Sequence, residues 1–145
     1  MITIIHDRLK TWYDQQLLDN QQGFRSGRGT ADGIYITKRV QQITDQIEKP
    51  VYILFIDLSA AFDHVVRPWL FQSIYQRFTT EADTTLIKIL EALYNHLTTA
   101  LAETPEDIIE LILGVRQGGP ESPPLYNLFM DYVMRVYMQL CKMKI

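Results

Sequence analysis

One segment constrains the fold more than any other: Val51–Leu58, which reads VYILFIDL. Its β-branched, aliphatic and aromatic residues predict a strand that is buried on both faces. The single polar residue in it, Asp57, is hard to hide, because an unpaired buried carboxylate is strongly disfavoured. We therefore expect Asp57 at an exposed strand end, in a cleft or on a cation. The alternative is that Asp57 starts a turn or caps the next helix.

Helical patterns surround this strand. A hairpin is expected over 97–102 and 108–115, because Thr104-Pro105-Glu106-Asp107 between them is typical of a turn. Thr30 and Ser122 are expected to cap helices, and Leu86, Ile89, Leu90 and Leu93 to face inward. The expected helices cover residues 4–18, 30–47, 68–78, 82–96 and 123–142. This order predicts an α+β fold in which helices pack a small antiparallel sheet.

Composition fits one soluble globular domain, with 47% hydrophobic and 21% charged residues in a chain of 145. The net charge of −3 argues against nucleic-acid binding, because phosphate neutralisation needs cations. However, the segment 23–39 holds Arg25, Arg28, Lys38 and Arg39 against one acid, Asp32. Charge alone favours an ordinary solvated surface, yet a basic patch can coexist with the acidic total.

Targeting signals are not recognised in this sequence. No apolar run reaches the roughly 20 residues that cross a bilayer, and the N-terminus lacks a signal-peptide pattern. Cys141 is the only cysteine, so an intrachain disulfide is impossible. We expect an intracellular protein, in the nucleus or cytoplasm, with no membrane partner.

Two glycine-rich loops could contact a ligand. In the first, GFRSGRGT at 23–30, Arg25 and Arg28 precede a helix start, which suits phosphate. In the second, GVRQGGP at 114–120, Arg116 and Gln117 project where the backbone can approach a flat ligand. A flexible basic turn explains the first loop as well as ligand binding does. A plain strand-to-helix turn does the same for the second loop.

Asp63 lies six residues beyond Asp57. Two acids this close could act as a paired acid and base, but the turn between them leaves that geometry open. We prefer a capping role for Asp63 at the helix behind Pro68.

Four stretches in this order resemble the reverse transcriptase family, most closely its non-LTR retrotransposon and group II intron-like branch. They are QQGFRSGRGTADGI, FIDLSAAFDHV, the hairpin reaching LILGV, and GVRQGGPESPPLYNLFMDYVM, which together span roughly 17–135. The resemblance implies a right-hand polymerase fragment. Residues 1–50 would be a fingers portion, and 51–145 a palm portion without the Asp-Asp hairpin and the thumb.

The resemblance also implies residue roles. Asp57 would be the catalytic carboxylate and a metal ligand, and the Leu58 carbonyl would hold the second metal. Phe62 would be the steric gate that favours deoxynucleotides. The nucleotide would further contact Arg25, Arg28, Gln117 and Gly118, and the template would contact Arg116 and Gly27. Asn127 and Asp131 match the family pattern, and we expect only structural roles for them.

The implied reaction is templated addition of a dNTP to a primer 3′-hydroxyl, with two Mg²⁺ ions (Mn²⁺ possible), an RNA template and a DNA primer. No Asp-Asp pair occurs in the 145 residues, so we expect the isolated chain to be inactive. Gly119 and Glu121 depart from the family pattern, which has a small or sulfur residue and an apolar residue there. We expect Glu121 to place a negative charge near the template path.

Two rival hypotheses remain. One is a domesticated, non-catalytic retroelement remnant that binds RNA or a protein partner; an in-frame Asp-Asp beyond residue 145 would argue against it. The other is an unrelated metal-dependent α+β enzyme, in which Asp57→Ala would abolish Mg²⁺ binding in a protein without nucleic-acid affinity. An uncovered palm edge also predicts self-association, which size-exclusion chromatography tests.

Overall fold

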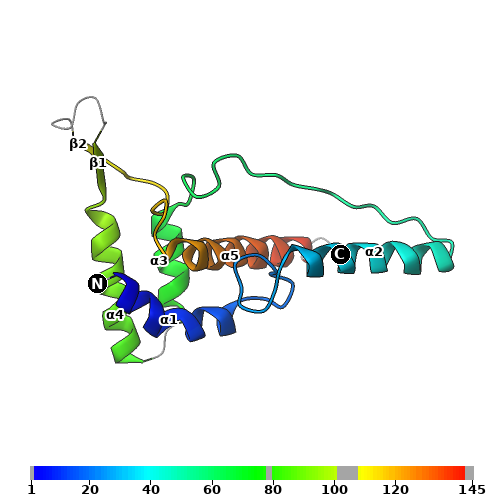
Figure 1. Ribbon diagram of the computed structural model, residues 1–145, viewed down its shortest axis with the longest axis horizontal. Coiled ribbons are helices and arrows are strands. Elements are labelled where there is room, and N and C mark those ends of the chain that lie inside the picture. Colours follow the sequence, from blue (N-terminus) through cyan, green and yellow to red (C-terminus); the bar gives the residue numbers. More distant parts are fainter. Residues whose placement is uncertain (1, 78–79, 101–107, 143–145) are drawn as a thin grey trace.

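The computed structural model describes residues 2–77, 80–100 and 108–142, and it confirms an α+β fold (Figure 1). Its elements are the helices α1 (Ile2–Gln16), α2 (Thr30–Gln46), α3 (Arg67–Tyr75), α4 (Glu81–Asn95) and α5 (Ser122–Lys142), and the strands β1 (Thr98–Ala100) and β2 (Ile108–Glu110). The helix ends agree with the predicted ones to within about three residues.

The predicted hairpin forms, but its strands are short. β1 pairs with β2 antiparallel, with Thr99 opposite Ile109. A further backbone bond from Leu111 N to Leu97 O (2.9 Å) prolongs the pairing toward α4. The expected turn at 104–107 lies outside the described residues. The hairpin therefore projects from the end of α4, as Figure 1 shows.

The core lies where α1 and α3 pack on the first half of α5 and α4 packs on α1 and α3. Leu70 and Ile74 of α3 are fully buried against Leu125 and Leu128 of α5. On α4 the buried positions are Ile87, Leu90 and Tyr94. The inward face is thus rotated from the predicted one, because Ile89 is exposed while Leu86 and Leu93 only border the core.

Arg67 ties the hairpin to α3. Its side chain is almost fully buried and donates only to backbone carbonyls: Gly114 O (2.7 Å), Tyr94 O (2.8 Å), Leu113 O (2.9 Å) and Leu111 O (2.5 Å). Burial lowers the pKa of the guanidinium. A planar fork with five donors suits this arrangement, because one side chain can satisfy several carbonyls that have no strand partner.

Asp131 fixes the end of α1 to α5. Its Oδ1 accepts from Leu18 N (2.9 Å), and its Oδ2 accepts from Arg77 (2.9 Å) and Arg135 (2.7 Å). The carboxylate is 1% exposed. The neighbouring Asn127 donates to Gly23 O and accepts from Gln21, so it holds the loop behind α1. Both side chains therefore have the structural roles that we expected.

The predicted buried strand at 51–58 is wrong. Every residue from Val51 to Leu58 is exposed, and none of them makes a backbone hydrogen bond within the described chain. β1 and β2 pair only with each other, so the apolar run lacks a ladder partner there. It crosses as extended chain from the far end of α2 to the turn before α3 (Figure 1).

α2 is equally unpacked. It contacts no other helix or strand of the described residues, and no residue of it is buried. Its N-cap is Gly29 rather than Thr30, and Asp32 accepts from Gly29 N at 2.7 Å. The apolar stripe of Ile36, Val40 and Ile43 is consequently exposed, together with the 51–58 segment.

Candidate functional site

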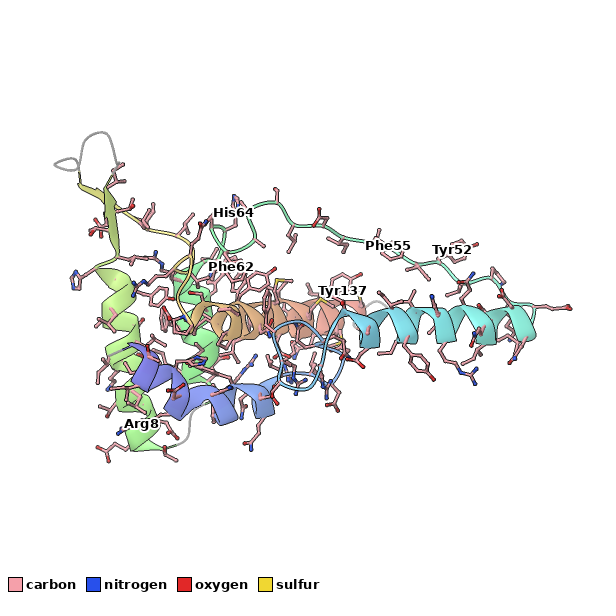
Figure 2. The ribbon with its side chains drawn as sticks, in the orientation of Figure 1. Arg8, Tyr52, Phe55, Phe62, His64 and Tyr137 are labelled. Atoms are coloured by element: carbon pink, nitrogen blue, oxygen red, sulfur yellow. The ribbon has the colours of Figure 1, made fainter. Side chains whose placement is uncertain are left out.

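Three segments that are far apart in the sequence meet at Phe62. Its ring stacks on Tyr126 of α5, with centroids 4.9 Å apart, and meets the edge of Phe24 at 5.9 Å. Phe62 therefore joins the first glycine-rich loop, the turn behind Asp57 and the start of α5. Figure 2 shows Phe62 under this turn, close to α5, while Tyr52 and Phe55 lie farther out along the extended segment.

An open cavity of about 560 Å³ lies beside Phe62. Asp57 and Leu58 line it from one side, and Phe24 of the first glycine-rich loop lines it together with Gln21, just before that loop. The structure thus brings three predicted site residues, Asp57, Leu58 and Phe62, to one cavity. Asp57 is the only acidic side chain among the lining residues.

The second glycine-rich loop reaches the same turn through hydrogen bonds. Val115 N donates to Phe62 O (2.9 Å), and Gln117 Nε2 donates to Asp63 Oδ1 (3.0 Å). Gly114 has φ +83°, and a Cβ there would lie 3.0 Å from the Asp63 backbone. A glycine is needed at 114 for both reasons. Gln117 thus belongs to the neighbourhood of the turn, but it does not line the Asp57 cavity.

The preferred capping role of Asp63 is wrong. The N-cap of α3 is Val66, and no side chain caps this helix. Asp63 instead lies in the turn 59–64, where its carboxylate accepts from Gln117. A contact with a residue 54 positions away could not be inferred from local sequence pattern.

Arg25 is held inside the protein. Its side chain is 7% exposed; Nε and Nη2 donate to Asp14, and Nη1 donates to Leu18 O, all at 2.9 Å. These bonds fasten the first glycine-rich loop to α1. A triphosphate would have to compete with them for the same donors.

The other cations and glycines of the two loops are more accessible. Arg28 donates from Nη1 to the backbone oxygen of the exposed Asp19 and from Nη2 to its Oδ1 (3.3 Å), and Arg116 is exposed. Gly27 (φ +72°) and Gly118 (φ +80°) both adopt left-handed backbone with open space around them. Arg116 and the backbone at Gly118 could therefore approach a phosphate or a base without rearrangement, whereas Arg28 would first have to leave Asp19.

The residues around Asp57 do not complete a two-ion magnesium site. Mg²⁺ requires several oxygen ligands, and a pair of ions needs more than one carboxylate. Within the described residues, no group of three or more His, Cys, Asp or Glu side chains could hold a metal. Asp57 and the Leu58 carbonyl could supply part of such a site.

Glu121 is buried at the start of α5, and its expected place near the template path stays a prediction. It is 0% exposed, and Tyr94 Oη donates to its Oε1 at 3.1 Å. Sequence reasoning missed this pair and also Arg67, because their partners lie 27 to 47 positions away. The only available signal was Glu121 itself, a charge where the family pattern has an apolar residue.

Alkaline pH is expected to unfold the protein partly through Tyr94. Burial raises the pKa of Tyr94 to about 12, against about 10 in the unfolded chain. The folded state therefore favours the neutral phenol. The stability that this preference contributes is complete below about pH 10 and is lost as the pH rises through about 12. We expect urea unfolding of Tyr94→Phe to show a pH slope shallower by up to about 1.4 kcal/mol per pH unit.

Tyr52→Phe is the matched control for this measurement, because Tyr52 is 93% exposed. It should leave the pH slope unchanged. An equal slope in wild type and Tyr94→Phe would show that the phenol is not held neutral by the fold.

Comparison with known proteins identifies the family. The model of the family described as reverse transcriptase (RNA-dependent DNA polymerase) matches residues 1–145. A search of curated proteins returned no match. Among the described helices, none has the length and hydrophobicity to span a membrane. With the family model covering the whole chain and the motif-bearing segments meeting around Phe62, the chain belongs to the reverse transcriptase family.

Proposed function

We propose that this chain is a fingers-palm part of an RNA-directed DNA polymerase of the non-LTR or group II intron-like branch, and that the Phe62 cavity receives the sugar of the incoming dNTP. The observation that carries the proposal is the meeting of three motif-bearing segments at Phe62. The Phe62 ring is held between Phe24 and Tyr126. A ring held in one position can exclude a ribose 2′-hydroxyl by shape.

The remaining roles follow from position and accessibility. Asp57 and the Leu58 carbonyl border the cavity and would contribute metal ligands. Arg116 has donors available for phosphates of dNTP, primer or template, and Arg28 would supply more on leaving Asp19. Gly118 presents open backbone, and Gln117 presents an amide that now contacts Asp63. Arg25 acts indirectly, by fastening the loop that carries Arg28.

Catalysis by the isolated 145 residues is not expected, because Asp57 is the only acid at the cavity. In primer extension on an RNA template with Mg²⁺, we expect no product above background. Supplying Mn²⁺ should not change this, since it needs the same carboxylates. Robust synthesis that Asp57→Ala abolishes would show that the chain carries a complete site.

Binding of nucleic acid is the property that the chain alone should retain. We expect Arg28→Ala and Arg116→Ala each to weaken binding of an RNA–DNA primer–template several-fold and to lower the salt slope by about one. Fluorescence anisotropy over a salt series measures both quantities. Lys88→Ala is the matched control, because Lys88 is an exposed cation on α4 that belongs to neither loop.

If Lys88→Ala weakens binding as much as Arg28→Ala, the affinity arises from net charge rather than from the proposed site.

The localisation in nucleus or cytoplasm remains part of this proposal.

A further inference from the structure

The start of α5 contains an unusual pair, Gly119 and Glu121. The Glu121 side chain lies fully inside the protein, with Oε1 bound by Tyr94 Oη at 3.1 Å. The hydroxyl of Ser122 lies 3.4 Å from the same phenol. Glu121 Oε2 is also buried, and no described residue bonds to it. A charge that is this enclosed has little freedom to move.

The Glu121 carboxylate lies directly against Gly119. A Cβ on Gly119 would lie 2.6 Å from Oε1 and 2.7 Å from Oε2. Real Cβ atoms essentially never come closer than 3.0 Å to another heavy atom. The φ of Gly119 is outside the left-handed region, so space rather than backbone torsion requires glycine here. Gly118 is the opposite case, with φ +80° and open space.

An exposed glutamate would swing away from an added methyl group at little cost. Glu121 cannot do so, because its carboxylate is enclosed and hydrogen-bonded. The carboxylate therefore occupies the space of a side chain at position 119.

We propose that Gly119 and Glu121 are a coupled pair that positions the loop 116–120. Ser122 N donates to Gly119 O (3.2 Å), so the pair lies at the junction of this loop and α5. The loop carries Gln117, whose amide reaches Asp63 at 3.0 Å. Displacing Gly119 would thus displace Gln117 from the turn behind Asp57. The effect of the pair on nucleic-acid binding rests on the proposed function.

A double-mutant cycle tests the coupling. Gly119→Ala should lower the thermal midpoint by roughly 4–10 °C, because it overpacks an enclosed site. In a Glu121→Ala background the same substitution should lose at least half of that effect, since the carboxylate is gone. In a Glu121→Gln background, which keeps the shape, the full effect should remain. Gly23→Ala is the control, because its nearest neighbour would be 3.7 Å away.

Positioning is read from the side-chain amide resonances of Gln117. They should shift in Gly119→Ala, return in Gly119→Ala/Glu121→Ala, and stay unchanged in Gly23→Ala. Primer–template affinity should fall several-fold and recover in parallel. Equal midpoint shifts in all backgrounds, or unmoved Gln117 resonances in Gly119→Ala, would overturn the proposal. If even the unsubstituted chain binds no primer–template, the proposed function fails, while the midpoints and resonances still decide the coupling.

Discussion

Replacing Arg67 by methionine is expected to lower the free energy of unfolding by roughly 3–5 kcal/mol, because three backbone carbonyls lose their donor and Tyr94 O loses one of its donors. Leu111, Leu113 and Gly114 lie on the chain that returns from β2, and their carbonyls have no other backbone donor among the described residues. Tyr94 O, at the end of α4, also accepts from Leu97 N at 3.2 Å. Methionine fills a similar volume but donates nothing. Urea unfolding followed by circular dichroism measures the change.

Two variants separate this effect from loss of charge. Arg67→Lys keeps the charge but cannot match four acceptors with one ammonium, so we expect it to recover only part of the stability. Arg8→Met removes an exposed arginine of α1, visible at the edge of the molecule in Figure 2, and should change stability by less than about 0.5 kcal/mol. A loss below about 1 kcal/mol in Arg67→Met would contradict the anchoring role.

Asp131→Ala is expected to destabilise the fold by roughly 3–5 kcal/mol, because it leaves the half-enclosed Arg77 without its counter-charge and Leu18 N without an acceptor. Burial already lowers the pKa of Arg77, and Asp131 opposes that shift. Removing the carboxylate therefore leaves a cation in poorly solvated surroundings. Chemical unfolding of the variant measures the loss.

Asp131→Asn distinguishes the two contributions. It can still accept from Leu18 N but carries no charge, so it should lose less stability than Asp131→Ala. The control is Asp45→Ala, since Asp45 is exposed on the unpacked α2. Should Asp131→Ala prove no worse than Asp45→Ala, the link between α1 and α5 would not depend on this carboxylate.

Local sequence pattern predicted the helices of this fold and failed at the strand. Helix periodicity and prolines such as Pro68 depend on neighbours in the chain, so these helices were predictable. Strand formation at 51–58 depends on a ladder partner, and an apolar composition does not supply one. On α4 the inward face was misplaced because the tertiary contacts of Tyr94, not periodicity, decide which positions are covered.

For the site, the motifs predicted which segments matter, but not how their side chains are used. Asp57, Leu58 and Phe62 share a cavity, as their closeness in sequence suggests. Arg25 was expected at the nucleotide, yet its donors contact Asp14 and Leu18. Asp63 was expected as a cap, yet it contacts Gln117. Such pairings depend on how α1, α3 and α5 pack. Local residue type and spacing do not reveal that packing.

Photo-crosslinking of a dNTP with an azide on its base tests whether the Phe62 cavity is a nucleotide site. With the primer–template bound, we expect crosslinks in peptides containing Phe24, Asp57–Phe62 or Gln117, reduced by competing dNTP. We expect Phe62→Ala to diminish them and Tyr52→Ala, in the exposed segment but outside the cavity lining, to leave them unchanged. Crosslinks confined to α2 or the hairpin, and insensitive to Phe62→Ala, would contradict a nucleotide site at this cavity.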